Sequence, residues 1–134
     1  MPIVLDASVA ANWHFQDERN EKADVILASI LQETAIVPIQ WWFEIRNTLL
    51  MGERRGRATE AQTMAFLKTL AGLPIEIDGL PDDEPLVALA RKHRLTIYDS
   101  AYLELAQRER MPLATFDVRL QVAAHAEGVR VLGE

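Results

Sequence analysis

Short apolar runs along the chain alternate with longer segments in which apolar residues recur every three or four positions. The short runs are typical of buried strands and the longer periodic segments of amphipathic helices. We expect strands at residues 3–5, 35–37, 74–77, 113–116 and 129–132. Strands that alternate with helices predict an α/β protein built on a parallel central sheet.

The periodic segments begin and end with residues that favour helix termini. Thr59 and Gln62 have the spacing of a capping box, which would turn Met64, Leu67, Leu70 and Ala71 inward. Acids at 82–84 and basic residues at 91–93 match the dipole of one further helix. Tyr98, Tyr102 and Leu105 would form the apolar face of a helix that begins near Asp99. The expected helices are at about 23–31, 40–54, 59–71, 82–93, 99–108 and 118–127.

Length and composition fit one globular domain that spans residues 1–134. The chain is 49% hydrophobic and 25% charged, the balance of an ordinary folded domain. It has no cysteine, which excludes disulfides, zinc–thiolate sites and cysteine nucleophiles. The first apolar run ends at Asp6 and is too short for a signal peptide or a membrane span. We therefore expect a cytoplasmic protein without a membrane partner.

The formal net charge of −6 changes the range of partners to consider. Nucleic acids favour basic surfaces, so an acidic chain is a poor non-specific binder of phosphates. Two bound divalent cations would offset most of that charge. The acidity therefore lowers the expectation of nucleic-acid binding without excluding a metal-dependent nuclease.

Four acids occupy positions where the chemistry of an α/β protein is expected. Asp6 and Asp117 directly follow predicted strands, and ligand sites of parallel sheets form at the carboxyl ends of strands. Asp99 begins a predicted helix at the same edge. Glu44 lies in an apolar stretch of another helix, where an isolated buried carboxylate would be costly. Each acid alone can equally be a helix cap, a dipole match or a solvated side chain.

Convergence of these acids at one edge would have a chemical consequence. Neighbouring carboxylates raise one another's pKa values, and a hard divalent cation relieves that conflict. Mg²⁺ and Mn²⁺ prefer oxygen ligands of this kind. Such a site can polarise a phosphate and activate a water molecule.

Four segments of the chain resemble motifs of one protein family. They are VLDASV at 4–9, VPIQWWFEIRNTL at 37–49, LTIYDSAYLELA at 95–106 and PLATFDVRL at 112–120. With an acid in each expected position, the sequence resembles the PIN-domain family and, within it, the VapC-type toxins of bacterial toxin–antitoxin pairs. The resemblance covers nearly the whole chain.

The resemblance implies a fold, an activity and partners. The fold is a three-layer α/β/α sandwich with a central parallel sheet of four to five strands. The activity is Mg²⁺- or Mn²⁺-dependent hydrolysis of RNA phosphodiester bonds, and the partners are a second copy of the chain and a small antitoxin protein. Asp6 and Asp99 would be the main metal ligands, and Glu44 and Asp117 would complete the acidic ring. The resemblance also suggests three hydrogen-bonding neighbours that support the site: Ser8, Asn47 and Thr115.

Two other functions are compatible with an α/β domain. A phosphoryl-transfer or receiver-type domain normally has a lysine at a strand end, whereas all lysines here fall in predicted helices: Lys22, Lys68 and Lys92. A catalytically inactive PIN-like interaction module would not need to retain four mutually repelling acids. The histidines have no ligand-like spacing and are expected to be exposed or structural, with His14 nearest to Asp6 in sequence: His14, His93 and His125.

The aromatic and basic residues leave two interpretations open. The tryptophans could stack RNA bases or contact an antitoxin, but aromatic residues at helical positions are more often core or dimer contacts. They are Trp13, Trp41 and Trp42. A basic cluster at a helix end could contact phosphates, or be solvated and match the helix dipole. Its cations are Arg54, Arg55 and Arg57.

Overall fold

A computed structural model of the protein describes residues 1–18 and 20–134. Five short strands form one sheet in the order β3-β2-β1-β4-β5, and every neighbouring pair is parallel. The strands are β1 (Ile3–Leu5), β2 (Ala35–Val37), β3 (Ile75–Ile77), β4 (Leu113–Ala114) and β5 (Val131–Leu132). The predicted parallel sheet is confirmed, although β4 and β5 are shorter than expected.

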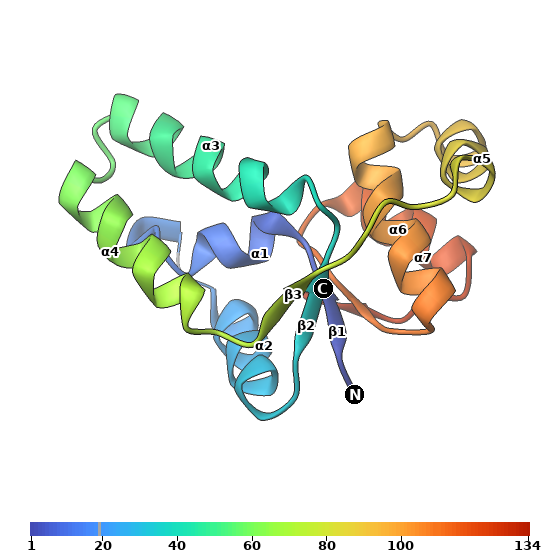
Figure 1. Cartoon of the computed structure of the whole chain (residues 1–134), viewed down its shortest axis with the longest axis horizontal. Helices are drawn as coiled ribbons and strands as arrows, with labels where there is room; N and C mark the ends of the chain where they lie inside the picture. The colour runs from blue at the N-terminus through green and yellow to red at the C-terminus, as the bar shows by residue number, and fades with distance from the viewer. Residues whose placement is uncertain (19) are drawn as a thin grey trace.

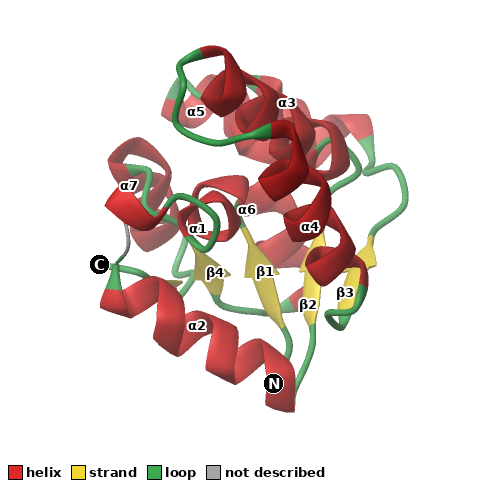
Figure 2. Cartoon of the chain, turned by 90° about the vertical axis from the view of Figure 1, so that its left-hand side faces the viewer, coloured by secondary structure: helices red, strands yellow, loops and turns green. Residues whose placement is uncertain are grey.

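Helices cover both faces of this sheet. They are α1 (Ala7–Asn12), α2 (Glu21–Gln32), α3 (Trp41–Arg54), α4 (Glu60–Ala71), α5 (Asp83–His93), α6 (Ile97–Glu109) and α7 (Val118–Ala126), with a 3₁₀ turn, η1 (Gln16–Glu18). Figure 1 shows α1 to α4 on one side of the strands and α5 to α7 on the other. The second view, in Figure 2, shows the strands side by side between these helices. The three-layer α/β/α prediction is confirmed.

The order of the strands creates one reversal of direction. From β1 the chain adds β2 and β3 on one side, then returns to place β4 and β5 on the other side of β1. The backbone N–H of Asp6 donates to the carbonyl of Ala114 at 2.9 Å, so the carboxyl ends of β1 and β4 are held together. Open parallel sheets bind ligands at such a reversal.

The core is assembled from the strands and from one side of each helix. Val4, Leu5, Val37 and Leu113 are completely buried in the sheet, and Tyr102 is the largest completely buried side chain in the described part of the molecule. Parallel strands that are covered on both faces consist of continuous apolar runs, which explains why 3–5 and 35–37 could be recognised in the sequence.

Helix α1 was not expected from the sequence, whereas the ends of the expected helices follow it closely, with one shift. Thr59 and Gln62 form the predicted capping box, in which each side chain accepts from the other residue's backbone N–H. Helix α6 begins at Ile97 rather than near Asp99, because the Thr96 hydroxyl accepts from the backbone N–H of Asp99 at 3.1 Å and caps the helix.

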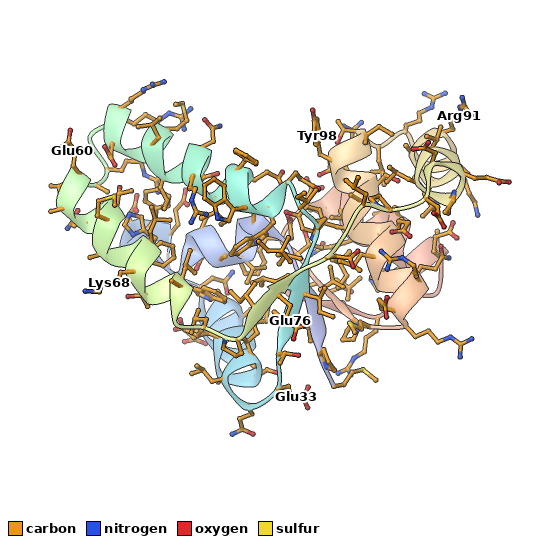
Figure 3. All side chains as sticks on the ribbon, in the orientation of Figure 1. Glu33, Glu60, Lys68, Glu76, Arg91 and Tyr98 are labelled. Atoms are coloured by element: carbon orange, nitrogen blue, oxygen red, sulfur yellow. The ribbon has the colours of Figure 1, made fainter. Side chains whose placement is uncertain are left out.

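Some residues expected inside are exposed. Met64 and Ala71 of α4 lie on the solvent side, whereas Leu70 of the same helix is buried. Tyr98 also projects outward from the start of α6 (Figure 3). Helical spacing identifies an apolar stripe, but which edge of that stripe faces the sheet depends on the packing angle of the helix. No helix within residues 1–18 and 20–134 is long and apolar enough to cross a lipid bilayer.

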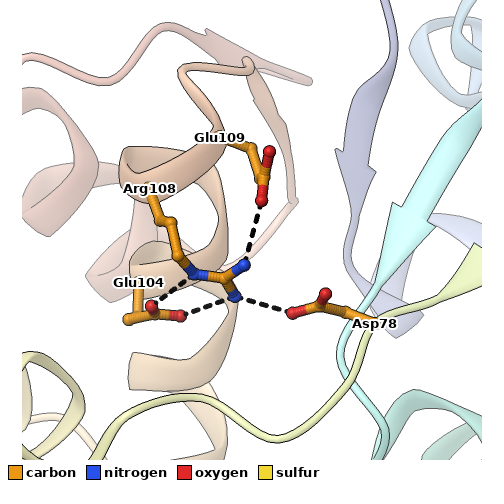
Figure 4. A network of polar contacts seen from close by, with 4 residues as sticks. All are labelled: Asp78, Glu104, Arg108 and Glu109. Atoms are coloured by element: carbon orange, nitrogen blue, oxygen red, sulfur yellow. Dashed lines mark hydrogen bonds and ion pairs between the residues drawn. The ribbon is translucent and has the colours of Figure 1, made fainter.

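An ion-pair cluster fixes α6 to the segment that follows β3. Arg108 contacts Asp78 at 2.6 Å, Glu104 at 2.8 Å and Glu109 at 3.0 Å (Figure 4). Glu104 is buried, and the carboxylates raise the pKa of Arg108 above its ordinary value. We call Asp78, Glu104, Arg108 and Glu109 the Arg108 cluster. It holds the helix that carries Asp99.

Candidate active site

Asp6 lies at the carboxyl end of β1 and is 8% exposed. Its Oδ2 accepts two hydrogen bonds, from Ser8 Oγ at 2.8 Å and from Thr115 Oγ1 at 2.7 Å. Each hydroxyl in turn accepts a backbone N–H, from Phe116 and Asp117 respectively, so its proton is directed towards Asp6. Among the described residues no side chain donates to Oδ1, which leaves that oxygen available to a ligand.

Asp117 occupies the N-cap of α7. Its Oδ1 accepts from the backbone N–H of Leu120 at 3.0 Å, so the capping role considered from the sequence is present. The cap does not isolate the residue from the other acids, because its charge raises the pKa of both Asp6 and Asp99. Asp117 therefore caps its helix and also contributes charge to the site.

Glu44 lies in the first turn of α3 and is partly buried. Its Oε1 accepts a hydrogen bond of 2.6 Å from the hydroxyl of Tyr102 on α6. Helices α3 and α6 belong to different layers of the fold (Figure 1), so this contact spans the end of the sheet. A second contact nearby joins the same helices, because Gln40 Nε2 donates to the carbonyl of Tyr98 at 2.8 Å.

The four predicted acids act on one another electrostatically. Burial and the charge of Asp117 raise the pKa of Asp6, although the hydrogen bonds from Thr115 and Ser8 oppose this shift. Burial and the charges of Asp6 and Asp99 raise the pKa of Glu44. Burial and the charges of Asp117 and Asp6 raise the pKa of Asp99. We call Asp6, Glu44, Asp99 and Asp117 the acid cluster, since the fold brings their charges within interaction range.

The donor atoms of the acid cluster are all oxygens, which suits a hard cation such as Mg²⁺ or Mn²⁺. Three of its four carboxyl groups have raised pKa values, and a bound cation would lower them. The side chains as they stand are not in coordination geometry: within residues 1–18 and 20–134, no three His, Asp or Glu groups could together hold one ion. The chemistry of the donors therefore fits a divalent cation better than their present spacing does.

The supporting residues predicted from the sequence divide into two groups. Ser8 and Thr115 contact Asp6 as described. Asn47 is exposed one turn after Glu44 on α3, and in the described part of the chain its side chain makes no hydrogen bond to the acids. Its supporting role stays a prediction.

Two of the three tryptophans pack in or against the hydrophobic core. Trp13 packs against the core and donates its Nε1–H to the carbonyl of Ala23 at 2.8 Å, and Trp41 is 4% exposed within the core. Trp42 is exposed, and the guanidinium of Arg46 lies 3.5 Å from its ring centre. The core interpretation thus holds for Trp13 and Trp41, whereas Trp42 remains accessible to a partner.

The basic cluster after α3 is only partly free. Arg57 pairs with Asp17 and Glu18 and lies over the ring of Phe15, so its charge is already compensated. Arg54 and Arg55 are exposed. Local pairing accounts for Arg57, whereas the exposed Arg54 and Arg55 leave both interpretations open.

The histidines do not join the acid cluster. His14 packs against Phe66, and burial lowers its pKa. His93 contacts Glu127 at 2.6 Å, and His125 pairs with Glu134. These surroundings agree with the structural roles expected for them.

Two residues near the acids were not identified from the sequence. Tyr102 was expected only as part of an apolar face, but its hydroxyl contacts Glu44. A sequence signal existed, because a buried tyrosine usually needs a hydrogen-bond partner, and Tyr102 lies one turn after Asp99 on the same helix. Arg119 is exposed and its charge lowers the pKa of Asp99, an effect that no spacing rule would have indicated.

Fold and site together define a three-layer α/β/α protein with a carboxylate cluster where the strand order reverses. The PIN domain family model matches residues 3–126. Ribonuclease VapC3 of Pyrobaculum aerophilum is 34% identical over 127 residues, which cover 90% of this chain and 92% of that protein. The chain therefore belongs to the PIN-domain family, in its VapC-type group.

Solved structures show the same fold at low sequence identity. PAE2754 from Pyrobaculum aerophilum matches with a TM-score of 0.72 and 21% identity, over 92% of this chain and 84% of that one. FitAcB from Neisseria gonorrhoeae matches with a TM-score of 0.64 and 19% identity, over 99% and 97%. VapBC2 from Rickettsia felis, bound to a promoter DNA fragment, matches with a TM-score of 0.65 and 10% identity, over 98% and 97%.

Proposed function

We propose that this protein is a Mg²⁺- or Mn²⁺-dependent endoribonuclease that acts as the toxin of a toxin–antitoxin pair. The observation that carries the proposal is the acid cluster, in which four carboxylates from separate elements act on one another. The relative Ribonuclease VapC3, at 34% identity over most of both chains, supports RNA as the substrate.

The residues of the acid cluster would have different roles in such an enzyme. Asp6 presents a fixed carboxylate, because Ser8 and Thr115 occupy one of its oxygens, while no side chain among the described residues donates to the other. Asp6 and Asp99 would be the main ligands of the divalent ion, and Glu44 and Asp117 would orient water or a second ion. The ion, when bound, would polarise the phosphate and lower the pKa of an attacking water.

The net negative charge of the protein agrees with a role for a bound cation. A chain with a net charge of −6 and an acidic site repels an RNA phosphate until cations are bound. The divalent ion would therefore serve both substrate binding and chemistry, and cleavage should depend on it strictly.

An antitoxin partner and a homodimer complete the proposal. The structural neighbours include complexes named FitAcB and VapBC2, and the fold of this chain matches them over nearly its full length. An uncontrolled ribonuclease would damage its host, so an inhibitory partner protein is expected.

The proposal is tested by incubating the purified protein, free of any partner, with end-labelled RNA. Cleavage should appear with Mg²⁺ or Mn²⁺, stop in excess chelator and return when the metal is restored. D6N and D99N should each abolish cleavage. The matched control is E76Q, because Glu76 is an exposed carboxylate on β3 (Figure 3), the edge strand that β2 separates from β1.

The outcomes separate the alternatives. Cleavage that continues in chelator would exclude the metal mechanism, and full activity of D6N would exclude the site assignment. A protein that binds a partner but cleaves no RNA with either metal would be an interaction module instead.

A further inference from the structure

Tyr102 stands out among the side chains around the acid cluster. Among the residues whose burial is described, it is the largest side chain that is completely buried, and it lies one turn after Asp99 on α6. Its hydroxyl nevertheless has a defined partner, Glu44 Oε1 at 2.6 Å, which is short for a hydrogen bond between two oxygens. Hydrogen bonds to a carboxylate away from water are among the stronger ones in proteins.

The hydroxyl is not needed to fill space. A phenylalanine would place the same ring in the same core without a hydroxyl to satisfy, although Glu44 Oε1 would then lose its donor. The hydrogen bond to Glu44 places the hydroxyl between the middle of α6 and the first turn of α3.

This contact has a specific effect on Glu44. It occupies Oε1, while in the described part of the chain no hydrogen bond or ion pair is formed by Oε2. A glutamate on a helix surface normally samples several rotamers, and ordering it costs conformational entropy. With Oε1 held by Tyr102, Oε2 is the oxygen of Glu44 that is left to accept a ligand.

We propose that Tyr102 is a positioning residue whose hydroxyl holds Glu44 in one orientation, with Oε2 available to a divalent cation or its water. The proposal rests on the proposed function, because it assigns Glu44 to a metal centre. Tyr102 itself touches neither the ion nor the RNA. It acts as hydrogen-bonding partners of ligand side chains commonly do, by fixing the direction of the ligand before the ion binds.

The first experiment compares Y102F with Y98F. Tyr98 is a matched control, because it is an exposed tyrosine on the same helix whose ring makes no hydrogen bond within residues 1–18 and 20–134. Mn²⁺ binding to the metal-free proteins is measured by calorimetry. We expect Y102F to bind Mn²⁺ about 10- to 100-fold more weakly, the usual effect of losing such a partner, and Y98F to match the wild type. Unchanged Mn²⁺ affinity in Y102F would overturn the proposal.

The second experiment asks whether Tyr102 acts through Glu44. The Mn²⁺ affinities of E44Q, Y102F and the E44Q/Y102F double variant form a cycle. If Tyr102 acts through Glu44, the double variant should bind Mn²⁺ as weakly as E44Q alone. If instead the fold-losses of Mn²⁺ affinity in E44Q and Y102F multiply in the double variant, Tyr102 acts independently of Glu44. That result would overturn the proposal.

Folding of each variant is checked by circular dichroism and thermal unfolding. If Y102F alone does not fold, E44Q/Y102F is compared with E44Q directly, because removing both partners together is milder than leaving one unpaired. Equal Mn²⁺ affinity then supports the proposal and a further loss overturns it.

RNA cleavage supplies a readout that separates this proposal from the proposed function. In the active wild type, Y102F should lower kcat by about 10- to 100-fold with little change in KM, since the substrate contacts remain. If the wild type binds Mn²⁺ but cleaves no RNA, the proposed function fails alone and the Mn²⁺ measurements still decide on Tyr102. If it does neither, both proposals fail.

Discussion

The acid cluster and the Arg108 cluster both contain residues of helix α6, and they differ in whether their negative charges are compensated by a cation of the protein. In the Arg108 cluster three carboxylates surround one guanidinium, and each is within 3.0 Å of it (Figure 4). The acid cluster has four carboxylates and little compensating positive charge. The charge of Arg119 has the smallest of the effects on the pKa of Asp99. The carboxylates near the C-terminal end of α6 are paired with a guanidinium, whereas those near its N-terminal end have no such partner among the described residues.

The difference shows where charge serves the fold and where it serves a ligand. A buried carboxylate is tolerated in the Arg108 cluster because its cation is built into the chain. The buried Asp6 has hydroxyl donors instead, and its pKa is raised. Groups with perturbed pKa values are candidates for function, and the acid cluster has the further property that a cation from solution would relieve the repulsion between its carboxylates.

Breaking the Arg108 cluster should have the largest effect on stability. R108M leaves the buried Glu104 without its cation, and we expect the free energy of unfolding to fall by about 3 kcal/mol. This is the low end for such a change, because Arg108 is 37% exposed. Urea unfolding of R108M and R91M measures the effect. Arg91 is exposed on α5 and forms no ion pair among the described residues, so R91M should unfold like the wild type.

Adding a cation to the acid cluster should have the next largest effect. Mn²⁺ at about 100 times its dissociation constant would stabilise the wild type by roughly 2.7 kcal/mol, because it binds only the folded state. Thermal unfolding with and without Mn²⁺ tests this, and D6N should show little of the gain. Equal stabilisation of D6N would mean that Mn²⁺ binds elsewhere.

The pH dependence of the metal-free protein should show a smaller effect of the same origin. The folded pKa values of Asp6, Glu44 and Asp99 are raised above the ordinary 3.8 and 4.5, so the folded protein binds more protons than the unfolded chain in this range. Stability from these groups therefore decreases as the pH rises from about 4 through the raised pKa values.

D6N removes the most buried of these acids and serves as the comparison. In chelator, the stability of D6N relative to the wild type should be greater at about pH 8 than at about pH 5, as measured by urea unfolding. A difference that stays constant with pH would show that Asp6 titrates as it does in the unfolded chain.

The smallest effect is expected at the rim of the Arg108 cluster. Glu109 is 41% exposed and pairs with Arg108 at 3.0 Å. Exposed ion pairs contribute little, so E109Q should change the free energy of unfolding by less than about 0.5 kcal/mol. A loss as large as that of R108M would mean that the cluster acts as one unit and not through Glu104.

The sequence by itself determined the parallel sheet, the position of Asp6 at the end of β1 and the order of the elements apart from α1, which was not expected. Asp117 was expected directly after a strand, but β4 ends three residues earlier, at Ala114. The features that the sequence determined follow from local rules: apolar runs mark buried strands, and capping residues such as Thr59 mark helix starts. Such rules depend on neighbours within a few positions, so they can be read without a structure. The same rules misplaced Met64 and Tyr98, because the direction of a helix face depends on what packs against it.

Only the tertiary structure decided which groups satisfy the acids. Thr115 reaches Asp6 across 109 positions and Tyr102 reaches Glu44 across 58. Arg108 pairs with Asp78 of the segment after β3, although either residue alone resembles an ordinary surface charge. Hydrogen bonds and ion pairs are effective only over a few ångströms, so their partners are fixed by the packing of the layers and leave no periodic signal in the sequence.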